Sequence, residues 1–95
     1  MTPHLYLYML KDRRHILKKF NNKPNIIGQL IKSARIRKNY TIVDLCRELE
    51  LLGIEMSRNE IYRIENNKMI VKDFELIAFC IVLDINFNDL KKFFA

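Results

Sequence analysis

Residues 57–68 carry two kinds of side chain at helical spacing. At about 100° per residue, a helix would place Ile61, Ile64 and Glu65 on one side. The other side would carry hydrogen-bonding groups, namely Asn59, Tyr62, Arg63 and Asn66, with Arg58 projecting from the first turn. Arginine can donate twice to guanine, and asparagine can pair with adenine through one donor and one acceptor. This face suits base edges in a DNA major groove, and the alternative is an ordinary solvated face.

Catalytic and metal-binding patterns are missing from the sequence. His4 and His15 lie far from any plausibly spaced carboxylate pair, and there is no glycine-rich phosphate loop or nucleophile motif. Cys46 and Cys80 are isolated from each other and lie in apolar helical patterns, so we expect them to pack as small hydrophobic residues. The sequence therefore predicts no enzyme, no metal and no cofactor. Two isolated thiols favour a reducing, cytoplasmic compartment.

The positive charge is concentrated at the N-terminus. Of the 95 residues, 1–24 carry six Lys/Arg and one Asp, a net +5, whereas 25–95 carry eleven and ten, a net +1. We expect a basic extension over 1–24 and one folded domain over 25–95, separated by a turn at Pro24. Such a charge distribution favours nucleic acid or an acidic partner. The extension could follow phosphates, enter a minor groove, pack as another helix or remain a charged tail. No apolar run approaches the ~20 residues of a membrane span.

Capping signals predict where helices begin and end. Asn25 is the candidate N-cap of a helix over 25–39, and Thr41 that of a helix over 41–53, with Gly53 as its stop. Ser57 followed by Glu60 is a capping-box pattern and predicts a helix over 57–67.

Apolar periodicity completes the predicted fold. The buried stripes expected for the first two helices are Ile27, Leu30, Ile31, Ala34 and Ile36, then Ile42, Leu45, Cys46, Leu49 and Leu52. A helix over 72–84 is the most apolar and is expected to be central, and a short helix follows over 86–94. Five short helices without a predicted strand make an all-α bundle.

The order of these elements resembles the Xre/Cro-type helix-turn-helix family of phage and bacterial transcriptional regulators, in a variant with a long turn. The family has an arginine late in its first helix, here Arg35, and a Leu-Ala pair in its second, here Leu45 and Cys46. Its Ile-Glu-Asn-Gly ending of the recognition helix corresponds to residues 64–67, and the segment VKDFELIAFCIVLDINFNDL also matches. The resemblance covers about residues 26–92. It implies a five-helix, lambda-repressor-like DNA-binding bundle.

The resemblance also implies roles for individual residues. Base contacts would come from Arg58, Asn59 and Arg63, with Tyr62 flanking them. Phosphate contacts would come from Asn66, Lys68 and the start of the second helix at Thr41. A partly buried ion pair between Arg35 and Glu65 would tie the recognition helix to the first helix.

Three features depart from the family pattern. Ile42 stands where the family often has a glutamine that contacts DNA. Glycines of the family are replaced by Asn39, Asn67 and Asp84, which must then adopt the left-handed conformation. The turn ELLGIEMS is several residues longer than the compact family turn.

The sequence therefore predicts a sequence-specific regulator of transcription, most simply a repressor that occupies its operator on double-stranded DNA. We expect a homodimer, because two half-sites give useful affinity, with Phe93 and Phe94 as the candidate interface. The alternative is an antitoxin-like or other protein-binding module on the same fold, with a toxin protein as partner. The nearly neutral domain and Ile42 favour this alternative.

Overall fold

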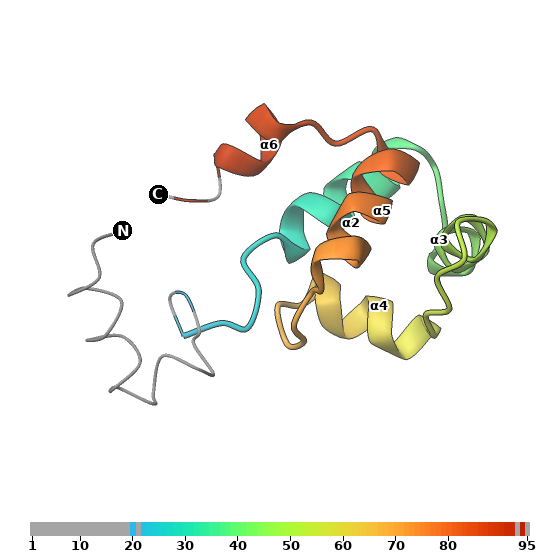
Figure 1. Cartoon of the computed structure of the whole chain (residues 1–95), viewed down its shortest axis with the longest axis horizontal. Helices are drawn as coiled ribbons and strands as arrows, with labels where there is room; N and C mark the ends of the chain where they lie inside the picture. Colours follow the sequence, from blue (N-terminus) through green and yellow to red (C-terminus); the bar gives the residue numbers. More distant parts are fainter. Residues whose placement is uncertain (1–19, 21, 93, 95) are drawn as a thin grey trace, which may run out of the picture.

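The computed structural model describes residues 20, 22–92 and 94, and these residues form helices connected by short turns (Figure 1). The helices are α2 (Gly28–Arg37), α3 (Ile42–Leu51), α4 (Arg58–Glu65), α5 (Asp73–Leu83) and α6 (Phe87–Lys91). Within the described part of the chain, the only β-type pairing is an isolated bridge between Phe20 and Lys23. The all-α prediction is confirmed for these residues. The predicted extension over 1–24 lies almost entirely outside them.

Two helices begin where the capping signals predicted. The Thr41 hydroxyl accepts a hydrogen bond from the Asp44 N–H at 3.0 Å, and the Ser57 hydroxyl accepts one from the Glu60 N–H at 3.1 Å. In each case the acid accepts a bond from the backbone N–H of the cap residue, which completes a capping box. The start of α4 is therefore fixed by its own sequence.

The start of α2 differs from the prediction. Ile27, not Asn25, is the residue at the N-cap, and the helix begins at Gly28. The Asn25 side chain still accepts hydrogen bonds from the N–H groups of Ile27 at 3.1 Å and Gly28 at 3.0 Å. Asn25 thus satisfies the first donors of the helix from further back in the chain.

Residues in the left-handed backbone conformation follow the ends of the helices, as expected. Asn39, Asn67 and Asp84 have φ values of 59°, 61° and 54°, and Gly53 has a φ of 84°. Short polar side chains tolerate this conformation better than other non-glycine residues do. Helix ends that would usually carry glycine can therefore form with asparagine or aspartate.

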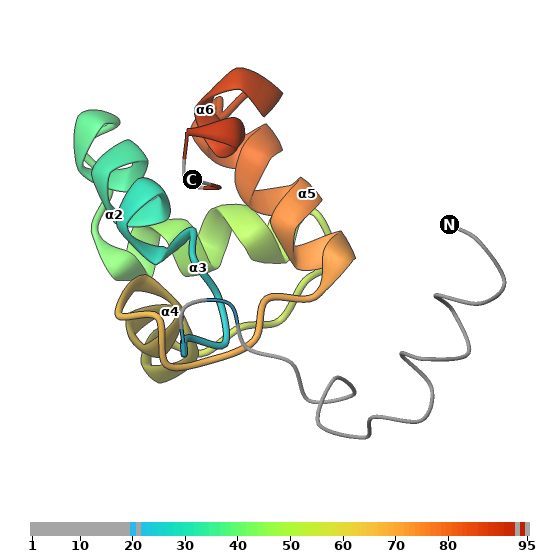
Figure 2. The ribbon, with the colours of Figure 1, turned by 90° about the vertical axis from the view of Figure 1, so that its left-hand side faces the viewer.

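The core lies where α2 and α3 pack against α4 and α5 (Figure 2). Its fully buried side chains are Ile31, Leu45, Leu49, Ile61, Ile64, Phe79 and Leu83. Two predicted core residues are exposed instead: Ile36 on the outer side of α2 and Leu52 beyond the end of α3. Cys46 and Cys80 are half-buried free thiols beside the core.

The helix over 73–83 is not central, contrary to the prediction. Its inner side buries Ala78, Phe79, Val82 and Leu83, but Phe74, Ile77 and Ile81 are 51%, 60% and 61% exposed. The reason is that α5 packs against α2 and α3 with the side that carries its buried residues, and the opposite side stays exposed. Overall apolarity therefore overestimated how much of this helix the described bundle covers.

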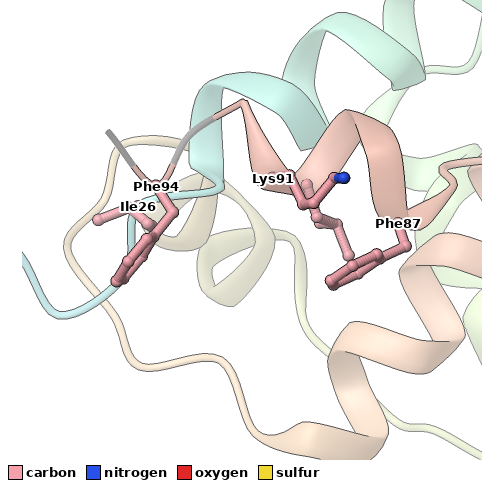
Figure 3. A pocket seen from close by; sticks show the side chains of 5 residues that line it. Ile26, Phe87, Lys91 and Phe94 are labelled. Atoms are coloured by element: carbon pink, nitrogen blue, oxygen red, sulfur yellow. The ribbon is translucent and has the colours of Figure 1, made fainter.

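The two ends of the described chain meet beside α6. The ring of Phe94 stacks on that of Phe20 with their centroids 5.0 Å apart. A cavity of about 430 Å³ lies next to this pair, and Phe94 and Ile26 line one end of it while Phe87 and Lys91 line the other (Figure 3). Phe94 is exposed, and Phe93, its predicted partner in a dimer interface, lies outside the described residues.

Candidate functional site

The outward side of α4 gathers the polar residues that the sequence singled out. We call Arg58, Asn59, Tyr62, Arg63 and Asn66 the α4 polar face, and all five are exposed. On the opposite side, Ile61 and Ile64 are completely buried and anchor the helix to the core. One short helix therefore presents two guanidinium groups, two amides and a phenol in a fixed arrangement.

Both acidic side chains of α4 form hydrogen bonds within the molecule. Glu60 lies at the edge of the polar face, and its carboxylate accepts a hydrogen bond from the Ser57 N–H at 3.3 Å. Glu65 is only 2% exposed and points into the molecule. The outward side of α4 is therefore electropositive, which suits an anionic partner.

A buried ion pair fixes the C-terminal end of α4. Arg35 on α2 donates from Nε to Glu65 Oε2 at 2.7 Å and from Nη2 to Glu65 Oε1 at 3.1 Å. The third nitrogen, Nη1, donates to the Tyr40 carbonyl oxygen at 2.9 Å. This is the pair that the family resemblance implied. It holds α2, the turn after α2 and α4 in one geometry, because a bidentate guanidinium contact restricts orientation as well as distance.

Backbone contact between α2 and α4 depends on Gly28. A Cβ atom at this position would lie 2.7 Å from the Glu65 carbonyl oxygen and would also collide with the carbonyl oxygen of Ile64. Only glycine allows the start of α2 to come this close to the end of α4. A glycine inside a helical pattern can signal such a close approach, but the pattern around Gly28 predicted no role for it.

Asn25 joins the same region from the other side. Its Nδ2 donates to the Ile64 carbonyl oxygen at 3.2 Å and to the Met69 carbonyl oxygen at 2.7 Å. Asn67 Nδ2 donates to the Asn25 carbonyl oxygen at 3.0 Å. Asn25, which is 8% exposed, thus fixes the segment that leaves α4. The sequence predicted only a capping role for this residue.

The predicted phosphate-binding residues lie around α4 with different freedom to act. Lys68 is exposed just beyond the helix. Asn66 is exposed, but its Nδ2 donates to the Tyr62 carbonyl oxygen at 2.7 Å. The Thr41 N–H already donates to Asp44 Oδ2 at 2.9 Å, and the Thr41 side chain also hydrogen-bonds this carboxylate, so a phosphate would compete with Asp44 for both donors of Thr41.

The Asp44 carboxylate, at the start of α3, is ionised and pairs with a neighbouring arginine. Hydrogen bonds from the backbone N–H and the side chain of Thr41 hold the pKa of Asp44 below its ordinary value. Arg47 donates to the same carboxylate at 2.9 Å. A phosphate approaching Thr41 would therefore meet a paired acid and not a free one.

Metal-ligating side chains and cysteine thiols were the other candidates for chemistry in the sequence. The described part of the chain contains no cluster of three or more His, Cys, Asp or Glu side chains that could hold a metal ion. Burial raises the pKa of the Cys46 thiol, and it does the same for Cys80, so both thiols stay protonated and poorly nucleophilic at neutral pH. None of the helices described is long and apolar enough to cross a membrane.

Comparison of the chain with protein-family models, with curated proteins and with solved structures gave no match. The function therefore has to be inferred from the residues of the site.

Proposed function

We propose that this protein is a sequence-specific DNA-binding regulator of transcription, most simply a repressor acting in the cytoplasm. The observation that carries the proposal is the α4 polar face. It is exposed and electropositive, and a buried ion pair together with a buried isoleucine anchor holds it rigidly. Rigid placement matters because base recognition needs donors and acceptors held at fixed positions.

The dimensions of α4 fit the proposed partner. An α-helix such as α4 is about 10–12 Å across with its side chains, and the major groove of B-DNA is about 12 Å wide. Arg58, Asn59 and Arg63 would contact base edges, with Tyr62 beside them. Asn66, Lys68 and the Thr41 hydroxyl would contact phosphates on the flanking backbone.

We also propose that α3 and α4 form a helix-turn-helix unit within a lambda-repressor-like bundle. The two helices pack against each other, and the residues between them make the long turn. Both begin with capping boxes, so their relative start points are fixed. A homodimer would place two copies of α4 on related half-sites.

The test is a titration of DNA from around the protein's own gene, at several salt concentrations. The native chain should bind one fragment specifically, and its affinity should fall linearly with salt on a log–log plot. Replacing Arg58→Ala together with Arg63→Ala should remove the preference, since each base contact contributes about 1–3 kcal/mol of discrimination.

A double variant with the same net charge provides the control. Lys32→Ala with Lys92→Ala also removes two positive charges, from exposed positions outside the α4 polar face. It should lower affinity modestly for all fragments and keep the preference. If both double variants behave alike, α4 does not recognise bases.

One observation favours a second candidate, a protein-binding module of the antitoxin type. Phe74, Ile77 and Ile81 leave an apolar surface on α5 that DNA recognition by α4 does not use. Weak binding without sequence preference, unchanged in the Arg58 and Arg63 variant, would favour this candidate. A pull-down with the native chain would then search for the partner, such as a toxin protein.

A further inference from the structure

The exposed side of α5 and the turn after α3 form one continuous apolar surface. Leu52, Phe74, Ile77 and Ile81 are 46%, 51%, 60% and 61% exposed, and together with Ile54 and Ala78 they line a single groove of about 370 Å³. We call these six residues the α5 apolar face. Among the residues that the structure describes, no member of the α4 polar face and no charged side chain lines this groove.

The area of the face is comparable with that of the largest apolar patch on an ordinary monomer. Side chains of this size carry on the order of 150–200 Å² each, so the four exposed members of the face, each about half exposed, leave roughly 380 Å² of apolar surface. Patches of this size commonly mark interaction sites. A helix that is apolar all round is normally buried on all sides.

We propose that a second copy of this chain covers the α5 apolar face, with the two α5 helices antiparallel across a two-fold axis. The spacing of the exposed residues is self-complementary in that arrangement. With the axis between Ile77 and Ala78, Phe74 of one copy comes level with Ile81 of the other. Each Ile77 then faces the other copy's groove, whose floor at Ala78 is lined by a small side chain.

The charges at the two ends of α5 do not oppose this pairing. Lys72 and Asp73 are exposed at the beginning of α5, and Asp84 is exposed at its end, where it pairs with Lys38 at 2.8 Å. An antiparallel arrangement brings the Lys72 end of one copy level with the Asp84 end of the other. Each end therefore offers one acid and one base to its counterpart, and like charges need not meet.

The small area places this interface among the weak, transient ones. Two copies would remove roughly 760 Å² of apolar surface from water, and the polar rim brings the total near the ~1,000 Å² lower limit of specific interfaces. A dissociation constant in the micromolar range is therefore expected. The dimer does not depend on DNA binding, and its test uses no DNA.

Sedimentation of the full native chain from about 1 to 200 µM should show a monomer–dimer equilibrium. Ile77→Asp places two carboxylates beside the axis, and since burying unpaired like charges is strongly unfavourable, the dissociation constant should rise at least about 100-fold. Phe87→Asp is the matched control, because Phe87 is exposed on α6 and lines a different cavity. It should leave the equilibrium unchanged.

A cross-link gives an independent test that does not rely on loss of association. Ile77→Cys should form a disulfide-linked dimer under mild oxidation, because the two residues flank the axis, whereas the native chain with its half-buried Cys46 and Cys80 should not. A native chain that stays monomeric throughout the range, or a dimer that Phe87→Asp disrupts and Ile77→Asp does not, would overturn the proposal. Unchanged thermal unfolding of Ile77→Asp by circular dichroism would show that the fold is intact.

Discussion

Glu65 is the residue on which the orientation of α4 depends most directly. Its carboxylate is 2% exposed and accepts two hydrogen bonds from Arg35. Glu65→Gln removes the negative charge and leaves the guanidinium, which is 12% exposed, without its counter-charge. Removing one partner of a buried pair costs about 3–5 kcal/mol, so urea unfolding should show a loss of about 3 kcal/mol.

Two comparisons make this prediction specific. Arg47→Gln breaks an ion pair whose Arg47 side chain is 62% exposed, and it should leave the unfolding midpoint unchanged. Arg35→Met combined with Glu65→Met should be less destabilised than Glu65→Gln, because no charge is left unpaired. A Glu65→Gln variant as stable as the native chain would show that the ion pair does not hold α4.

Asn25 gives a second prediction for a single residue. Asn25→Asp keeps the shape of the side chain but replaces the Nδ2 donor with an oxygen that faces the carbonyl oxygens of Ile64 and Met69. A buried acceptor and a partly buried one lose their partner and meet a negative charge, so the free energy of unfolding should fall by at least about 2 kcal/mol. Thermal unfolding followed by circular dichroism would measure it, and a change below about 0.5 kcal/mol would contradict the assigned role.

Helical spacing in the sequence predicted which residues form the α4 polar face, but it did not predict the role of Asn25. Helical spacing alone separates Ile61 and Ile64 from Asn59, Tyr62 and Arg63, so the two sides of α4 could be assigned from sequence. The partners of Asn25 lie 39 and 44 residues further along the chain, and no local pattern connects them. Such a contact becomes visible only once the fold is known.

The contact between α2 and α4 leaves no room for a side chain at Gly28. Gly28→Ala would normally favour a helix by about 1 kcal/mol. Here the added Cβ collides with backbone carbonyl oxygens at the end of α4, which cannot move aside as a side chain can. We therefore expect a net loss of at least about 1 kcal/mol in urea unfolding.

The neighbouring residue provides the control for this substitution. Gln29 lies one position further along α2 and is exposed, so Gln29→Ala should change the free energy of unfolding by less than about 0.5 kcal/mol. If Gly28→Ala were stabilising, the two helices could not be as close as described.

Elements differ in how well the sequence predicted them. The starts of α3 and α4 were predictable because Thr41 with Asp44 and Ser57 with Glu60 satisfy the first donors of each helix locally. The exposure of α5 was not, since its apolarity does not say which side the other helices contact. The helix predicted over 86–94 is only Phe87–Lys91, because apolar residues alone do not show where a helix stops.

The whole molecule separates its proposed interactions in space and in sequence. The α4 polar face offers positive charge and hydrogen-bond donors, and the α5 apolar face offers uncharged surface. A dimer formed through the α5 apolar face would carry two α4 polar faces. Two such faces raise the affinity for a pair of DNA half-sites without any new kind of contact to DNA. The charge excess of residues 1–24 adds a basic segment to the same chain.

The central claim is that this protein recognises a DNA sequence through α4. Selection from a pool of random double-stranded DNA by the native chain tests it without assuming where an operator lies. We expect enrichment of one recurring motif, and we expect separate selections with Arg58→Ala and Arg63→Ala to relax different base positions within it. The claim would be contradicted if the DNA selected by the native chain stayed random in sequence at low and moderate salt. It would also be contradicted if both variants selected the same motif unchanged.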